Sequence, residues 1–202
     1  TAIQNKELTD EEKNRIIVEI VLGMRYVHKH NYMHRDLKPS HILLNKENHV
    51  RISGFFLAKE EKLDESQTKG IGTLRFMAPE LFDESSDTKY TRKIDVYSFG
   101  IILSYIITGE YPPFSLKNII NGKTPALPEN ITHWSHDLIK SCLSFDPSKR
   151  PSFAEIFDIL KENNFDLFSD SKGQNLTGKQ IGMKEKIESR IKEIDAFELQ
   201  HQ

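Results

Sequence analysis

The sequence predicts a mainly α-helical domain with short β-hairpins, and three observations lead to this prediction. Apolar residues recur at helical spacing between residues 9 and 30, behind a helix-capping sequence. Residues 94–107 are apolar around most of a helix circumference, which is typical of a helix at the centre of a domain. Between them, the short apolar segments 42–44 and 50–52 flank a polar turn and indicate a hairpin.

Composition excludes several classes of protein. The 202 residues are enough for one substantial domain, or for one domain plus an appendage, and the net charge of -2 does not favour a basic nucleic-acid surface. The longest apolar segment, 99–107, falls far short of the roughly 20 residues that span a membrane. The single cysteine, Cys142, cannot form an internal disulfide, and no secretory signal opens the chain. We therefore expect a cytoplasmic protein, with a nuclear location also open, that binds neither nucleic acid nor membrane.

The first helix begins behind Thr9, which forms a capping box with Glu12, and it ends near residues 30–31. The hairpin 42–52 follows, and the polar residues 54–72 indicate a surface loop. Further helices are expected at 78–82, at 94–107 with Thr91 as cap and Gly109 as stop, at 116–121, at 135–143 and at 152–161.

The end of the chain is expected to be a linker, 166–178, and a charged helical tail, 179–202, after a domain of residues 1–165. Isoleucines along the tail leave two alternatives open. In the first, residues 179–200 associate with another protein as a partner helix or a short coiled coil. In the second, the tail docks on its own domain or remains a frayed helix in solvent. The tail is shorter than three to four heptads, which favours the second alternative.

Residues 32–44, with the sequence YMHRDLKPSHILL, carry the strongest chemical signal. Asp36 and Lys38 lie two residues apart on a loop, as suits groups that handle a hydroxyl and a phosphate. This stretch closely resembles the catalytic loop of protein kinases, HRDLKPxN, with His41 in place of the asparagine. The resemblance extends over about residues 8–161, where Gly72-Thr73, APE at 78–80, DVYSFG at 95–100 and DPSKRP at 146–151 follow in the family's order.

The resemblance implies the helical C-terminal lobe of a serine/threonine-type kinase, leaning toward the tyrosine-kinase-like group. It implies that Asp36 accepts or orients the substrate hydroxyl proton, that Lys38 stabilises the transferring phosphoryl group, and that Thr73 bonds to Asp36. Leu43 falls at a cofactor-binding position. Structural roles fall on a further set of residues. These are His34 stacked with Phe55, Arg35 in the HRD triplet, Asp95 holding the loop backbone, and Arg150 paired with Glu80.

Metal binding is where the sequence departs from the family. The family holds magnesium with the aspartate of DFG and the asparagine after the catalytic loop. Here Gly54 replaces the aspartate and His41 the asparagine, so we assign no metal ligand. Mg²⁺ prefers hard oxygen ligands to a ring nitrogen. His41 is then a substitution tolerated after loss of catalysis or, alternatively, a ligand for a softer metal.

Several elements of a complete kinase do not appear in the sequence. We find no Gly-rich loop, strand lysine or partner glutamate, so the N-terminal lobe is expected to be absent from this chain. ATP and Mg²⁺ are expected only if that lobe is present upstream and the lost ligands are compensated. Ser66 and Thr68 are candidate phosphorylation sites that Arg35 would bind, or ordinary hydroxyls of a polar loop.

Three hypotheses about function remain. The first is a pseudokinase that serves as a docking or regulatory module for a protein partner. The second is an active serine/threonine kinase, whose N-lobe lies upstream and whose substrate is a protein. The third is a truncated remnant with no independent role.

Overall fold

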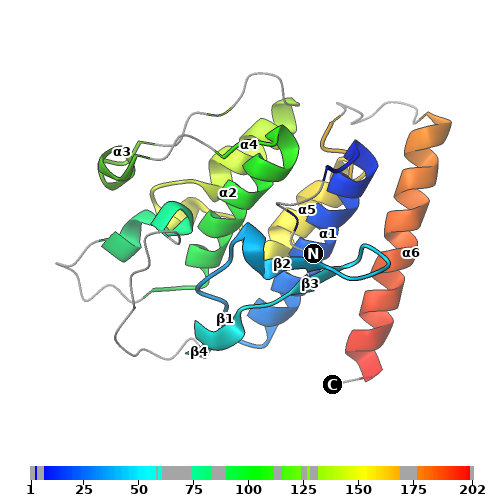
Figure 1. Ribbon diagram of the computed structural model, residues 1–202, viewed down its shortest axis with the longest axis horizontal. Coiled ribbons are helices and arrows are strands. Elements are labelled where there is room, and N and C mark those ends of the chain that lie inside the picture. Colours follow the sequence, from blue (N-terminus) through cyan, green and yellow to red (C-terminus); the bar gives the residue numbers. More distant parts are fainter. Residues whose placement is uncertain are drawn as a thin grey trace.

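The computed structural model describes residues 3, 7–57, 59–60, 74–82, 90–111, 115–123, 127, 132–168 and 177–200. Over these residues the chain is mainly helical, which confirms the predicted fold class (Figure 1). The helices are α1 (Asp10–Lys29), α2 (Lys93–Thr108), α3 (Leu116–Ile120), α4 (His133–Cys142), α5 (Phe153–Glu162) and α6 (Gly178–Gln200). The strands are β1 (Tyr32–Met33), β2 (Ile42–Leu44), β3 (Val50–Ile52) and β4 (Lys59–Glu60). None of the described helices is long and apolar enough to cross a membrane.

Helix α2 is the buried centre of the domain, as predicted. Its side chains Phe99, Ile102 and Leu103 are fully buried, and the helix packs against α1 and α4. It ends at Gly109, whose φ of 77° is the left-handed conformation typical of a glycine after a helix. The expected cap was wrong by one residue. Arg92 is the N-cap, while the Thr91 hydroxyl accepts a bond from the Lys93 N–H.

Local capping bonds explain where the other helices begin. Thr9 and Glu12 form the expected capping box on α1, and Ser152 and Glu155 form another on α5. Helix α4 begins two residues earlier than predicted, because the Thr132 hydroxyl accepts a bond from the Ser135 N–H and so caps the helix.

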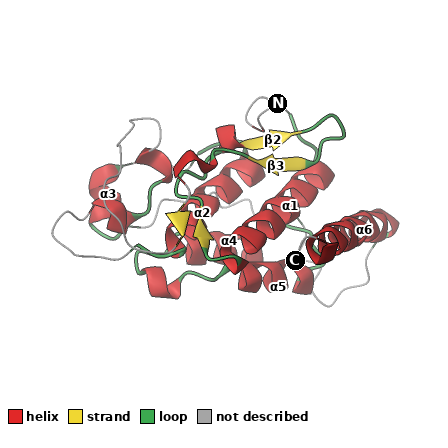
Figure 2. Cartoon of the chain, turned by 90° about the horizontal axis from the view of Figure 1, so that it is seen from below, coloured by secondary structure: helices red, strands yellow, loops and turns green. Residues whose placement is uncertain are grey.

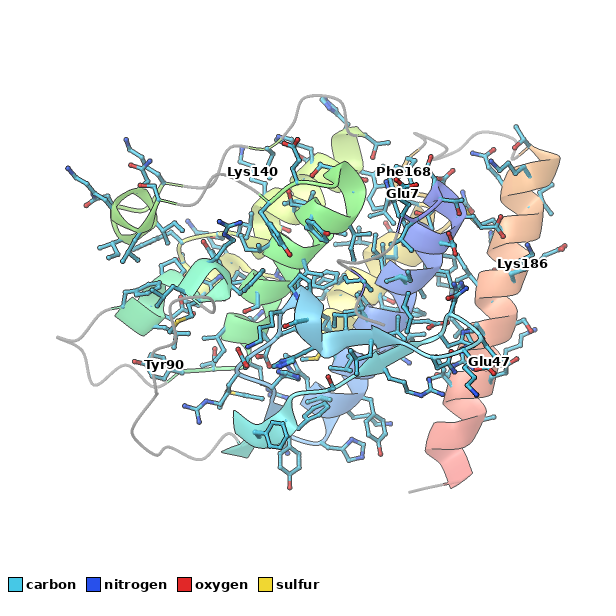
Figure 3. The ribbon with its side chains drawn as sticks, in the orientation of Figure 1. Glu7, Glu47, Tyr90, Lys140, Phe168 and Lys186 are labelled. Carbon is cyan, nitrogen blue, oxygen red and sulfur yellow. The ribbon has the colours of Figure 1, made fainter. Side chains whose placement is uncertain are left out.

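Two short antiparallel pairs of strands flank the loop that carries Asp36. Strands β2 and β3 pair antiparallel with Ile42 opposite Ile52, as predicted, and they lie along α1 (Figure 2). Figure 3 shows Glu47 in the turn between them. Strands β1 and β4 form a second pair, with Tyr32 opposite Glu60. The assignment of 54–72 to a loop was therefore wrong at β4. Strand β4 has only two residues and is held by backbone hydrogen bonds, so it shows no alternating apolar pattern by which the sequence could predict it.

The predicted linker 166–178 begins too early. Leu167 is fully buried, and its N–H donates a 3.0 Å bond to Oδ1 of Asn14, itself buried in α1. The Asn14 amide donates in turn to the Asp166 carboxylate at 3.3 Å. Residues 166–168 therefore belong to the packed domain, and α6 begins at Gly178. Residues 169–176 lie outside the described part of the chain, and the division into three parts otherwise remains a prediction.

Helix α6 docks on α1, which confirms the expectation that the tail packs on its own domain (Figure 1). Met183 and Ile187 are buried at the contact, with 8% and 1% of their surface exposed. Ion pairs join Arg190 to Glu19 at 3.3 Å, and Lys186, labelled in Figure 3, to Glu11 at 2.7 Å. Association of residues 179–200 with another protein remains a prediction.

The buried isoleucine of α6 provides a test of this docking. Ile187→Ala should lower the free energy of unfolding by about 2–4 kcal/mol, because it removes packed methyl groups and leaves a cavity. Ile181→Ala, on the same helix but 44% exposed, should change it by less than about 0.5 kcal/mol. Urea unfolding measures both variants, and equal effects would contradict the docked position of α6.

Candidate active site

The Asp95 carboxylate holds the candidate catalytic loop in place. It lies in the first turn of α2, is only 1% exposed, and accepts bonds of 2.8 Å from the N–H groups of both His34 and Arg35. A third bond of 2.9 Å joins it to Nε2 of His28. Arg35 has a φ of 68°, a left-handed conformation that is costly for a residue with a side chain. The two bonds to the loop backbone offset this strain and set the direction of the residues that follow.

Asp36 and Lys38 come together directly after this anchor. The Lys38 ammonium donates a 2.7 Å bond to Oδ2 of Asp36, whose side chain is 12% exposed. The other oxygen, Oδ1, is shielded from solvent and has no hydrogen-bond partner among the described residues. A shielded, unpaired carboxylate oxygen is a strong acceptor for a hydroxyl proton. Thr73, the partner expected from the sequence, lies outside the described residues, as do Ser66 and Thr68.

His34 serves as a packing and bonding residue. Its Nε2 donates a 2.8 Å bond to the Ser53 carbonyl, while Nδ1 accepts the Asp36 N–H at 3.3 Å. Together these two bonds require a neutral ring. Burial lowers the pKa of His34, although the Ser53 carbonyl and Asp95 oppose this effect. The expected contact with Phe55 is present, with ring centroids 4.7 Å apart.

The segment after β3 departs from a metal-binding geometry. Gly54 has no side chain to contribute, and Phe56, two residues later, is 98% exposed. His41 ends the short 3₁₀ turn 39–41, and its Nδ1 lies 2.9 Å from the Asp36 carbonyl oxygen. A carbonyl only accepts, so Nδ1 carries the hydrogen, and the ring's free lone pair is on Nε2, a nitrogen donor where Mg²⁺ prefers oxygen. These two residues do not fit Mg²⁺.

Within the described residues, no group of three or more His, Cys, Asp or Glu side chains could hold a metal ion. Leu43, assigned to cofactor binding from the sequence, lies in the middle of β2 opposite Arg51 and is partly buried.

The Arg150–Glu80 pair holds a second segment in position. Two nitrogens of the buried Arg150 guanidinium donate to the two Glu80 oxygens at 2.7 and 2.8 Å, as expected. The same guanidinium donates to backbone carbonyls of Ser144 and Phe145. It also lies 5.1 Å from the Tyr97 ring, and burial raises the pKa of Tyr97 to about 12. The pair fixes the turn 79–82 against the helical core.

Besides Asn14, two further buried polar residues in α1 were not singled out from the sequence. His28 bonds to Asp95, and its position on the apolar side of α1 was the only signal. Glu19 accepts a 2.6 Å bond from the Val50 N–H and lies 2.7 Å from Nδ1 of His49. It thereby ties the hairpin β2–β3 to α1, and a glutamate on the buried face of an amphipathic helix was the available signal.

Comparison with known proteins agrees with this geometry. A family model, protein kinase domain, matches residues 1–160. A probable serine/threonine-protein kinase of Dictyostelium discoideum is 37% identical over 155 residues, covering 73% of this chain and 17% of the relative. The serine/threonine/tyrosine-protein kinase HT1 of Arabidopsis thaliana is 37% identical over 162 residues, covering 77% of this chain and 41% of the relative. A probable inactive serine/threonine-protein kinase of Dictyostelium discoideum is 38% identical over 172 residues, covering 75% of this chain and 14% of the relative.

The fold and the loop thus define a helical kinase lobe, and the chain belongs to the protein kinase domain family, of serine/threonine type. It spans less than half the length of each of these relatives, at 17%, 41% and 14%. The leaning toward the tyrosine-kinase-like group remains a prediction.

Replacing Asp95 tests its role as the anchor of the loop. Asp95→Asn should lower the free energy of unfolding by about 2–4 kcal/mol, because an amide offers one acceptor where the carboxylate serves two backbone N–H groups. The amides of His34 and Arg35 should then exchange with solvent faster. Asp137→Asn, at a side chain that is 81% exposed, is the matched control and should have little effect. Unchanged protection of both amides would contradict the anchor.

The lowered pKa of His34 predicts a dependence of stability on pH. In the unfolded chain His34 takes up a proton near pH 6.5, whereas the folded ring resists protonation until lower pH. The unfolded state therefore binds more protons, and stability falls as the pH drops below 6.5. His34→Gln should remove part of this slope, measured by urea unfolding between pH 7.5 and 5.

Proposed function

We propose that this domain is a pseudokinase that serves as a docking or regulatory module rather than as a phosphotransferase. One observation carries the proposal: the two positions that hold the metal in the family are Gly54, without a side chain, and His41, whose Nδ1 donates to a backbone carbonyl. The contacts of Asp95 and Arg150 that hold the fold are intact. The scaffold is therefore kept while the metal ligands are lost.

Kinase relatives imply proteins as substrates or partners, and a docking module needs a protein partner. One relative that is 38% identical is described as a probable inactive kinase, so a similar sequence already carries that description. Helix α6 buries one side on α1, and the opposite side of residues 179–200 is a candidate surface for association with a partner.

An active serine/threonine kinase is the second candidate, and the geometry of Asp36 favours it. The carboxylate is bonded to Lys38 at 2.7 Å through Oδ2, and Oδ1, although shielded, has no partner among the described residues and would be an unpaired acceptor for a substrate hydroxyl that reached it. This candidate requires an N-lobe that supplies the ATP site, together with magnesium ligands other than His41 and Gly54. Phosphorylation at Ser66 or Thr68, bound by Arg35, would belong to this mode of action.

A phosphotransfer assay on the full-length protein separates the two candidates. With radiolabelled ATP and Mg²⁺, we expect no more transfer from the wild type than from Asp36→Asn. The double variant His41→Asn, Gly54→Asp should raise transfer, by about tenfold or more, if loss of the metal ligands is the main defect. Mg²⁺-dependent turnover in the wild type that disappears in Asp36→Asn would falsify the pseudokinase proposal. A thermal-shift titration with ATP shows independently whether nucleotide binds.

A further inference from the structure

Gly54 and the His41 ring compete for the same space. A Cβ atom built on Gly54 would lie 2.6 Å from Cγ of His41 and closer still to Nδ1 and Cε1. Contacts under 3.0 Å essentially never occur for a real Cβ, so residue 54 has no room for any side chain while the imidazole is in this position. The φ of Gly54, 87°, also lies in the left-handed region that favours glycine.

Backbone bonds keep the two residues next to each other. The His41 carbonyl accepts the Ser53 N–H at 2.9 Å and the Ser53 hydroxyl at 3.2 Å. The His41 N–H donates to the Lys38 carbonyl at 2.9 Å, which closes the turn that carries the ring. Since residues 41 and 53 are tied together, Gly54 cannot move away from the imidazole without breaking the start of the hairpin.

The ring itself is held by a bond into the catalytic loop. Nδ1 of His41 donates to the Asp36 carbonyl at 2.9 Å and lies 3.6 Å from Oδ2 of the same residue. The His34 ring lies nearby, with its centroid 6.0 Å from that of His41. The imidazole is therefore wedged between the residue that the family uses for the substrate hydroxyl and the residue that replaces the family's metal ligand.

We propose that His41 and Gly54 are one coupled replacement and that His41 is a positioning residue. The imidazole occupies the place of a side chain at residue 54, and its Nδ1–H braces the backbone of Asp36. This proposal deepens the pseudokinase function, and it rests on that function for the interpretation of residues 41 and 54 as lost metal-ligand positions. It implies that an aspartate cannot be restored at residue 54 while His41 remains, so the two changes depend on each other.

A double-mutant cycle on thermal stability tests the coupling. Gly54→Ala should lower the midpoint of thermal unfolding by roughly 6–12 °C in the wild type, and by less than half of that in a His41→Ala background. The backbone strain at Gly54 is common to both backgrounds and cancels. Gly109→Ala is the matched control, because it has a similar φ of 77° but nothing within 4 Å of its Cβ. Its effect should be the same in both backgrounds.

Equal shifts for Gly54→Ala in the two backgrounds would overturn the coupling. If Gly54→Ala does not fold, a second measurement on the wild type tests the position of the His41 ring. Nitrogen-15 spectra of the histidine rings at pH 8, with His41→Gln for assignment, should show His41 as the Nδ1–H tautomer. The Nε2–H tautomer would overturn the bracing of Asp36. Neither measurement depends on ATP, so the coupling fails or holds independently of the phosphotransfer assay.

Discussion

The buried Asp95 carboxylate is the constraint on which the rest of the site depends. It accepts both N–H groups at the turn of the catalytic loop and bonds to His28 of α1, so one charge joins α2, the loop and α1. A buried carboxylate needs several donors to offset its desolvation, and these three are provided by groups distant in sequence. The left-handed Arg35 and the position of Asp36 both follow from this arrangement.

Residues that hold the backbone and residues that hold a metal have separate roles in this fold. Asp95, His34 and Arg150 are buried and satisfy polar groups of the main chain, so losing one of them leaves unpaired buried groups and costs stability. A metal ligand contributes to chemistry but is not needed for the helical core to pack. This separation explains how a kinase lobe can keep its geometry while His41 and Gly54 stand at the metal positions.

The tail helix is linked to the same framework. Arg190 of α6 reaches Glu19 of α1, which in turn accepts the Val50 N–H of β3. These polar contacts connect the docked tail to β3, the strand that ends two residues before Gly54. Such buried or half-buried networks rigidify the elements that they join.

Local signals in the sequence determined most of the fold. The capping boxes at Thr9 and Ser152, the stop at Gly109 and the β2–β3 pairing all depend on neighbouring residues, so pattern and spacing were enough to predict them. The motif residues of the loop likewise identified Asp36 and Lys38 as the candidate catalytic pair.

Tertiary structure alone decided the features that depend on packing between distant segments. The burial of Leu167, the choice between a docked and a frayed tail helix, and the β1–β4 pairing are of this kind. The relation between His41 and Gly54 is the clearest example, because the sequence shows two separate substitutions. The backbone bond between Ser53 and His41 places the His41 ring where a side chain on residue 54 would lie. This steric conflict depends on positions in space, so the separation of the two residues in the sequence does not reveal it.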